Sequence, residues 1–482
     1  MAIGHRIIHP LPREQHFYEG FLSFSGELVF RAGVGLPEDV AELWGELLGN
    51  FTAHKLTLRV EPDVSLPAYA VCIDRAEAVL PDEDVYCVTV NETGVSLGAK
   101  DLNGLRYAFY TFLQMLERRG DETITGFSVP YSFISDAPVM CFRGVHVCIF
   151  PDTDLRLIEK YIMMAAFTKF NYIVLESWGG VRFDNFPYWL DKGLSKEQLR
   201  PLIRRAQLMG LEVIPLLNSL GHATASRDAL GKNVFLERCP EMAAYLEPYG
   251  YDWCISNPAV KALLKKLRLE MYDLFGPSEY FHIGGDEAYF LATCDRCAAQ
   301  PFLPLVSGYL NGLCEEIVRE GRRPMMWSDM LLDPNDWKNG EYVYANSTPE
   351  RPTHKLLETL DRRYIIMDWQ YNIFKGPDRT AAKFMESGFT TILCPYCEYE
   401  GCGNDVALAE SAKEEHTEGV LLTTWSRQAQ IFPLLAVQAS LLWHRETVRY
   451  IQPTIISTEL LRKLCPSAGF YDKAGWLNGI NG

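Results

Sequence analysis

The chain has 482 residues, of which 48% are hydrophobic and 12% aromatic, and its formal net charge is −16. This composition is typical of a globular protein that is long enough for two domains, and it excludes a largely disordered chain. The strong negative charge disfavours nucleic acid and anionic membranes as partners.

The first part of the chain, up to residue 136, has the pattern of a small α+β domain. Helical spacing of hydrophobic residues predicts helices near residues 40–48 and 105–116. Residues 126–138 contain two prolines and show no hydrophobic period, so we expect a linker there. Alternating hydrophobic and aromatic residues predict strands at Leu22–Phe30, Lys55–Val60, Tyr69–Ile73 and Val85–Val90.

Residues 137–482 alternate short apolar segments with longer amphipathic ones, which predicts a parallel sheet with crossover helices. Eight or nine such units over about 300 residues favour a (β/α)8 TIM barrel over an open sheet. One strand is surplus to that barrel. The candidates are Gly144–Cys148, Tyr172–Leu175, Glu212–Leu217, Tyr280–Ile283, Pro324–Trp327, Tyr342–Ala345, Ile365–Asp368, Thr391–Pro395 and Gly419–Thr423.

The segment His282-Ile283-Gly284-Gly285-Asp286-Glu287 places two adjacent carboxylates just after a pair of glycines. In a regular strand the two side chains would point to opposite faces, but glycines allow the backbone to turn both toward one pocket. Two carboxylates that share a site do not ionise equally, so one of them can act as an acid near neutral pH. This chemistry suits the cleavage of a glycosidic bond.

Three tryptophans, Trp327, Trp369 and Trp425, each lie at the end of a predicted barrel strand. The C-terminal ends of the strands are where barrel enzymes carry their chemistry. A single tryptophan is more often part of a core. Three at equivalent positions indicate an apolar pocket that grips the faces of a sugar ring.

Taken together, these motifs resemble glycoside hydrolase family 20, the β-N-acetylhexosaminidases, over nearly the whole chain. The resemblance implies that Glu287 is the acid/base and that Asp286 orients the acetamido group of the substrate. Residues 85–115 are similar to the family's non-catalytic N-terminal domain. The resemblance also implies substrate-binding roles for Arg143, His222, His282, Trp327, Trp369, Tyr396, Glu398, Trp425 and Arg427.

The activity that this resemblance implies is exo-acting, retaining hydrolysis of terminal N-acetylglucosamine or N-acetylgalactosamine. The 2-acetamido oxygen of the substrate would replace a protein nucleophile, with Tyr396 holding the acetamido carbonyl and Glu287 moving the proton. We expect neither a cofactor nor a catalytic metal, and a carbohydrate as the only partner. The oligomeric state is left open.

Several positions depart from the family pattern. The aspartate expected after the second barrel strand is absent from Glu176-Ser177-Trp178, and Leu216 and Asn218 replace acidic residues after the third. Arg427 stands where the family has a carboxylate. Two alternatives therefore stay open: a hydrolase for a modified, for example anionic, N-acetylhexosaminide, and a catalytically weak carbohydrate-binding protein.

The 13 cysteines are odd in number and mostly lie in apolar segments, as expected for reduced thiols. The pair Cys294 and Cys297, together with Cys239 and Cys254 from the preceding region, has spacing suited to a structural zinc site, with free thiols as the alternative. The N-terminal residues lack a signal-peptide core, so we expect a cytoplasmic protein unless a signal peptide was removed.

Overall fold

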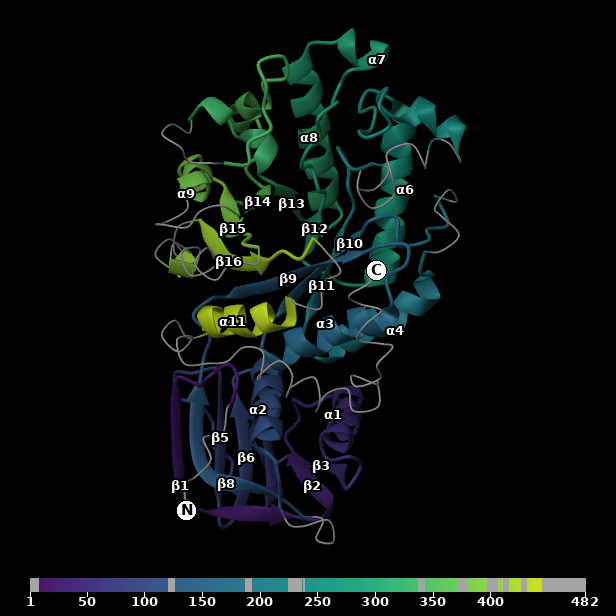
Figure 1. Cartoon of the computed structure of the whole chain (residues 1–482). Coiled ribbons are helices and arrows are strands. Elements are labelled where there is room, and N and C mark those ends of the chain that lie inside the picture. The colour runs from purple at the N-terminus through teal and green to yellow at the C-terminus, as the bar shows by residue number, and fades with distance from the viewer. Residues whose placement is uncertain are drawn as a thin grey trace.

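The protein folds into two stacked units, a sheet with two helices at the N-terminal end and a barrel above it (Figure 1). The fold is described from a computed structural model. It covers residues 8–119, 126–186, 193–223, 236, 239–336, 343–371, 379–396, 406–407, 409–410, 416–425 and 431–443.

The N-terminal unit is a mixed sheet with strand order β1-β8-β5-β6-β4-β2-β3, and β7 pairs with β8. Two amphipathic helices, α1 (Glu38–Phe51) and α2 (Leu102–Met115), cover one face of the sheet. This agrees with the predicted α+β domain. The strands are β1 (Glu14–Phe24), β2 (Gly26–Ala32), β3 (Leu56–Pro62), β4 (Ala70–Asp74), β5 (Tyr86–Asn91), β6 (Gly94–Ala99), β7 (Glu117–Arg119) and β8 (Gly126–Asp136).

Two details of this unit differ from the sequence-based expectation. Residues 126–138 do not form a linker, because Gly126–Asp136 is strand β8, which pairs with β1 and β5. The segment does alternate, with Phe127, Val129, Tyr131 and Phe133 between Ser128, Pro130 and Ser132, but its prolines obscured this strand pattern. The single strand expected at Leu22–Phe30 is divided into β1 and β2, and Gly26 in β2 has a φ of +73°.

The second unit is a closed barrel of eight parallel strands in the order β10-β11-β12-β13-β14-β15-β16-β9. The expected (β/α)8 barrel is therefore confirmed. The strands are β9 (Phe142–Ile149), β10 (Tyr172–Ser177), β11 (Glu212–Leu216), β12 (Tyr280–His282), β13 (Arg323–Trp327), β14 (Ile365–Asp368), β15 (Thr390–Leu393) and β16 (Thr417–Leu422).

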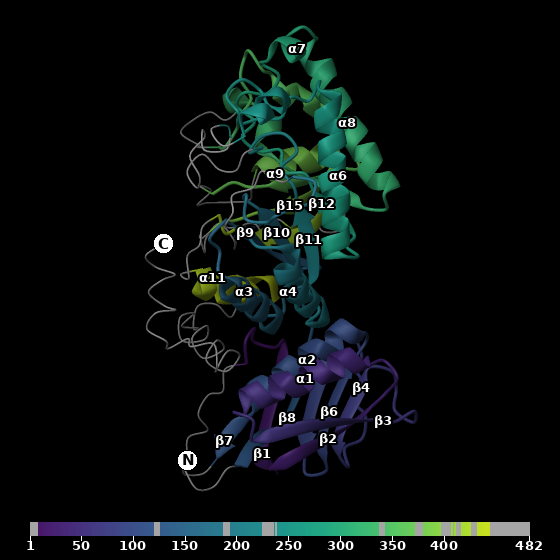
Figure 2. The same cartoon turned by 90° about the vertical axis from the view of Figure 1, so that its right-hand side faces the viewer.

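Helices surround this barrel and connect its strands (Figures 1 and 2). They are α3 (Leu155–Phe167), α4 (Lys196–Leu208), α6 (Pro258–Phe275), α7 (Asp295–Ala298), α8 (Phe302–Arg319), α9 (Arg379–Glu386) and α11 (Ile431–Trp443), with 3-10 turns η1 (Pro240–Tyr245), η2 (Asp329–Leu331), η3 (Pro334–Asp336) and η4 (Thr353–Glu358). No helix among the described residues is both long enough and apolar enough to cross a membrane.

The surplus strand of the sequence analysis is Tyr342–Ala345. Its described residues, 343–345, belong to none of the eight barrel strands. The Tyr344 N–H donates to Gln370 Oε1 (2.8 Å), and the Tyr344 carbonyl accepts from Gln370 Nε2 (3.1 Å). A side chain thus binds both backbone groups that a neighbouring strand would otherwise pair with.

Alternate residues of each strand fill the inside of the barrel. Phe142 stacks on Tyr172 with 4.1 Å between ring centroids, and both rings meet Tyr280 edge-on. Higher in the barrel, Trp327 and Trp369 belong to the same internal cluster. Because side chains alternate along a strand, the neighbours of these residues point outward.

The helices α1 and α2 lie between the N-terminal sheet and the barrel helices α3 and α4 (Figure 2). A buried ion pair joins the two units, with Lys169 Nζ 3.2 Å from Asp136 Oδ2 and neither side chain exposed. Tyr86 bonds to both groups, and Trp443 of α11 covers the ammonium at 4.8 Å. The interface therefore contains a fully buried ion pair.

Candidate active site

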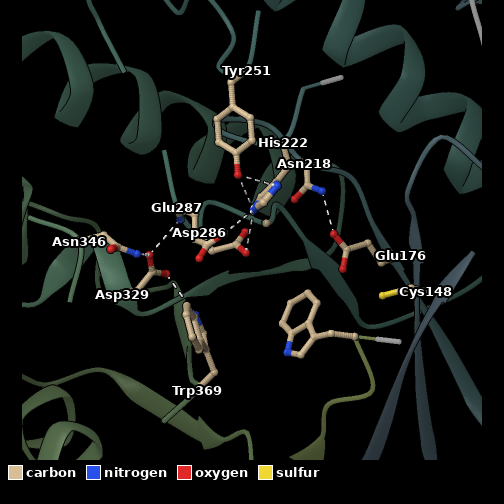
Figure 3. A network of polar contacts seen from close by, with 12 residues as sticks. Cys148, Glu176, Asn218, His222, Tyr251, Asp286, Glu287, Asp329, Asn346 and Trp369 are labelled. Carbon is tan, nitrogen blue, oxygen red and sulfur yellow. Dashed lines mark hydrogen bonds and ion pairs between the residues drawn. The ribbon is translucent and has the colours of Figure 1, made fainter. Parts of the chain in front are cut away.

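The two adjacent carboxylates lie at the C-terminal end of β12, the strand that ends at His282. Gly284 and Gly285 follow with φ values of +68° and +95°, and Glu287 itself has a φ of +48°. A positive φ is costly for a residue with a side chain, and such strain gathers at functional positions. These turns bring Asp286 and Glu287 to the same side of the chain (Figure 3).

Gly284 is required at its position for a second reason. A Cβ there would lie 2.0 Å from Asn218 Oδ1, which follows the neighbouring strand β11. The close approach lets the two strand ends pack without a side chain between them. The turn at residues 284–287, called here the carboxylate turn, therefore packs directly against the loop after β11.

His222 joins the two carboxylates. Its Nε2 atom is 3.2 Å from Asp286 Oδ2 and 3.5 Å from Glu287 Oε2. Asp286 is buried, whereas the Glu287 side chain is 34% exposed. Of the two carboxylates, Glu287 is therefore the one that solvent reaches. The other oxygen of Asp286, Oδ1, is buried without a hydrogen-bond partner among the described residues.

The environment of His222 favours its charged form. Burial by itself lowers the pKa of the ring, but the charges of Asp286 and Glu287 outweigh this and raise it to about 9. The Tyr251 hydroxyl lies 2.8 Å from His222 Nδ1 and 3.2 Å from His222 Nε2, so it contacts the ring near both nitrogens. At neutral pH the site therefore holds a positive charge between two carboxylates.

Asp329, just after β13, is a third carboxylate that the sequence analysis missed. It accepts hydrogen bonds from the Glu287 backbone N–H (2.9 Å), Asn346 Nδ2 (2.6 Å) and Trp369 Nε1 (3.1 Å) (Figure 3). Burial, and then the charge of Asp286, raise the pKa of Asp329 to about 7. An acidic residue two positions after the strand-end tryptophan was the signal available in the sequence.

Aromatic side chains form the walls around these groups. Trp327 lies 5.3 Å from Trp425 and 4.4 Å from His282, measured between ring centroids. Trp369 lies 5.2 Å from Tyr371, whose hydroxyl accepts a hydrogen bond from Trp425 Nε1. The structure thus brings together all three tryptophans that the sequence singled out.

His282 lies beneath this wall and is fully buried. Burial lowers the pKa of its ring well below the usual value, so the ring is neutral at physiological pH. Its Nδ1 atom accepts from the Gly284 N–H (3.0 Å), which assigns the remaining proton to Nε2. His282 therefore fixes the start of the carboxylate turn.

A buried polar cluster adjoins the pocket on the side of β9 and β10. Glu176 accepts a hydrogen bond from Asn218 Nδ2 (2.7 Å; Figure 3). It also lies 2.8 Å from His146 Nε2. The next residue but one, Trp178, packs 4.9 Å from the His222 ring. Glu176 and Trp178 thus occupy the region where the family pattern led us to expect an aspartate, and sequence reasoning assigned neither of them a role.

Arg143 does not lie in this site, and its expected role in substrate binding is wrong. It is the second residue of β9, at the opposite end of the barrel, and it points outward because its neighbour Phe142 points inward. Its guanidinium donates to the carbonyls of Met140 (2.6 Å) and Lys169 (2.9 Å) and to the Tyr107 hydroxyl (3.0 Å). Arg143 belongs to the interface with the N-terminal unit.

The remaining expected residues are placed only in part. Tyr396 follows β15, and its ring lies 5.3 Å from that of Tyr371. Glu398 and Arg427 lie outside the described residues, so the roles expected for them stay predictions. Three of the four expected zinc ligands, Cys254, Cys294 and Cys297, come together, as detailed below.

Comparison with known proteins places this site in a family. The model for the catalytic domain of glycosyl hydrolase family 20 matches residues 187–445, and the model for domain 2 of the family matches residues 5–137. The chain belongs to glycosyl hydrolase family 20. The paired carboxylates after β12 and the cluster of tryptophans beside them thus belong to a family member.

Relatives within the family are distant. The chain is 28% identical over 221 residues to β-hexosaminidase subunit A1 of Dictyostelium discoideum, covering 42% of this chain and 39% of the relative. It is 23% identical over 355 residues to the β-hexosaminidase subunit beta of Mus musculus, covering 64% and 63%. The chain therefore spans less than two thirds of the length of these curated relatives.

Solved structures share the fold. The family 20 exo-β-N-acetylglucosaminidase of Vibrio harveyi in complex with N-acetylglucosamine aligns with a TM-score of 0.69 at 17% identity, covering 94% of this chain and 77% of that one. The β-N-acetylhexosaminidase of Bacteroides fragilis aligns with a TM-score of 0.67 at 18% identity, covering 96% of each.

Proposed function

We propose that this protein is a retaining β-N-acetylhexosaminidase that removes terminal N-acetylhexosamine by substrate-assisted catalysis. The observation that carries the proposal is the unequal pair Asp286 and Glu287, of which one is buried and the other is partly exposed. Family membership and the activities named for the relatives support the substrate class.

Asp286 is suited to the acetamido group. One of its oxygens faces His222, and the other, Oδ1, has no protein partner among the described residues. A buried acceptor of this kind gains most from a donor that arrives with the substrate. The acetamido N–H would bind Oδ1, which turns the acetamido oxygen toward the anomeric carbon.

The first step forms a bond between that oxygen and the anomeric carbon while the glycosidic C–O bond breaks. Glu287 gives its proton to the leaving oxygen, and Asp286 stabilises the positive charge of the cyclised intermediate. In the second step, water attacks the anomeric carbon, Glu287 takes the water proton, and the acetamido group is restored. Two inversions give net retention.

The aromatic residues and Asp329 complete the site. Trp327, Trp369 and Trp425 would hold the sugar ring and the acetamido methyl by apolar contact. Asp329 fixes the backbone of Glu287 through the 2.9 Å hydrogen bond from its N–H. The acid is thereby held in place without losing an oxygen of its own side chain to that contact.

The test is a panel of nitrophenyl glycosides that share the leaving group and differ in the sugar. We expect turnover of the β-N-acetylglucosaminide or the β-N-acetylgalactosaminide and none of the plain β-glucoside, and strong inhibition by a thiazoline that mimics the cyclised intermediate. Comparable rates on the glucoside would mean a protein nucleophile. Binding of N-acetylglucosamine without turnover of any glycoside would instead favour the carbohydrate-binding alternative.

A further inference from the structure

Three thiols and one carboxylate converge on a single point beside the segment that follows the active-site carboxylates. Cys254 Sγ is 3.4 Å from Cys294 Sγ and 3.7 Å from Cys297 Sγ. Glu247 Oε1 is 3.6 Å from Cys294 Sγ. The four possible ligand atoms all lie within 4.8 Å of one another.

These separations match the edges of a tetrahedral zinc site. Zinc–sulfur bonds of about 2.3 Å imply sulfur–sulfur edges of about 3.8 Å, and a zinc–oxygen bond of about 2.0 Å implies a sulfur–oxygen edge of about 3.5 Å. A disulfide would instead need two sulfurs at about 2.0 Å. The geometry is therefore that of ligands around an ion.

Hydrogen bonds around the cluster orient its members. The second oxygen of Glu247, Oε2, accepts from the backbone N–H groups of Thr293 (2.8 Å) and Cys294 (2.5 Å), which turns Oε1 toward the thiols. The Ser256 hydroxyl donates to Cys297 Sγ (2.9 Å), and Gln300 Nε2 donates to that hydroxyl (3.1 Å). Such outer contacts are what hold metal ligands in register.

The charge of the cluster also calls for a cation. Glu247 is 1% exposed, and no Lys, Arg or His in the described part of the chain is found in an ion pair with it. A buried carboxylate next to three thiols is costly unless it is neutralised. A divalent ion would supply the missing positive charge.

We propose that Glu247, Cys254, Cys294 and Cys297 bind one Zn²⁺. Four protein ligands close the coordination shell, so the site is structural and not catalytic. The three thiols bind as thiolates and release their protons to solvent. Glu247 takes the place that the sequence analysis gave to Cys239, which is not a member of this four-ligand cluster.

The ion would tie together two segments that flank the proposed catalytic groups. Cys254 is three residues after Tyr251, which bonds to His222. Cys294 is five residues after Tyr289, whose side chain bonds to Glu287. Cys254 and Cys294 are 40 residues apart in the chain. The zinc would thus fix the relative positions of the two segments that contact Glu287 and His222. The metal proposal itself does not depend on the proposed activity.

The experiment measures metal content on the full chain, purified without chelators or metal-affinity resin from a zinc-supplemented culture. We expect about one zinc per chain, and loss of most of it in the double variant Cys294→Ser, Cys297→Ser. The matched control is Cys314→Ser, a buried thiol of α8 outside the cluster, which should keep its zinc. Glu247→Gln should weaken zinc retention against a competing chelator dye.

A second measurement covers the case in which the double variant does not fold. Wild-type protein reconstituted with Co²⁺ should show thiolate-to-cobalt charge-transfer absorption and the intense visible bands of tetrahedral cobalt. Wild-type protein with less than about a tenth of an equivalent of zinc and no such bands would overturn the proposal. So would a Cys254–Cys294 disulfide in the non-reduced peptide map, or full zinc content in the double variant.

Discussion

The backbone N–H of Glu287 donates a 2.9 Å hydrogen bond to Asp329, so the residue proposed to move the proton is held by a carboxylate from the next strand of the barrel. Asp329 is in turn fixed by Trp369 and Asn346. The acid is therefore positioned through its main chain, by a contact that uses neither oxygen of its side chain.

When the transferable proton is removed, the loss of activity should depend on the leaving group of the substrate. Glu287→Gln keeps the shape of the side chain, and we expect kcat/KM to fall by about 10²–10⁴-fold on substrates with poor leaving groups. Activated aryl glycosides should lose less in the first step. Glu279→Gln, an exposed residue just before β12, serves as the control. An unchanged rate in Glu287→Gln would reject the assignment.

Asp329→Asn tests the support of the acid. Three donors meet the two oxygens of Asp329, and asparagine offers only one oxygen, so at least one buried donor loses its partner at a cost of about 1–3 kcal/mol. We expect a lower melting temperature and a lower kcat. Asp336→Asn, on an exposed turn, should change neither. Wild-type kcat in Asp329→Asn would show that the contact does not position Glu287.

Gly284→Ala tests whether the carboxylate turn depends on its close approach to Asn218. The new Cβ would need a positive φ and would lie 2.0 Å from Asn218 Oδ1, so the turn must shift. Displacement of a catalytic group by about 1 Å can cost about 10²-fold in rate. Gly312→Ala in α8, where a Cβ meets nothing within 4 Å, is the control and should be active. Full activity in both would refute the argument.

His222 makes stability depend on pH. Its pKa is raised from 6.5 to about 9 in the folded state, so its contribution is complete below about pH 6.5 and is lost as the pH rises through about 9. Between about pH 7 and about pH 9 the wild type should lose about 2 kcal/mol more stability than His222→Gln. Urea unfolding at several pH values measures this difference, and parallel profiles would contradict it.

Arg143→Gln tests the corrected placement of that residue. Its hydrogen bonds and its position 5.1 Å from the Trp443 ring lie at the unit interface, so the variant should have a lower melting temperature and an unchanged KM. The expected contrast is with Trp369→Phe, which should alter KM. A raised KM for Arg143→Gln at unchanged stability would restore the original expectation.

The barrel and the paired carboxylates could be predicted because periodicity and a short motif carry them. The direction of the Arg143 side chain could not be predicted. Every residue of β9 is buried, so no alternation of polar and apolar residues shows which side chains point into the barrel. The surplus strand looked regular because nothing in the sequence shows that Gln370 binds the backbone of Tyr344. Glu247 lacked a signal altogether, because no motif links it to the cysteines.

The buried ammonium of Lys169 has consequences for how this protein can be handled. Its counter-charge, Asp136, comes from the sheet unit, while Lys169 and the covering Trp443 come from the barrel. A fragment that begins at residue 137 would lack Asp136, so Lys169 would have no counter-charge. Trp443, which covers the ammonium, would be exposed to solvent. Catalytic fragments and domain exchanges should therefore include the N-terminal sheet unit together with the barrel.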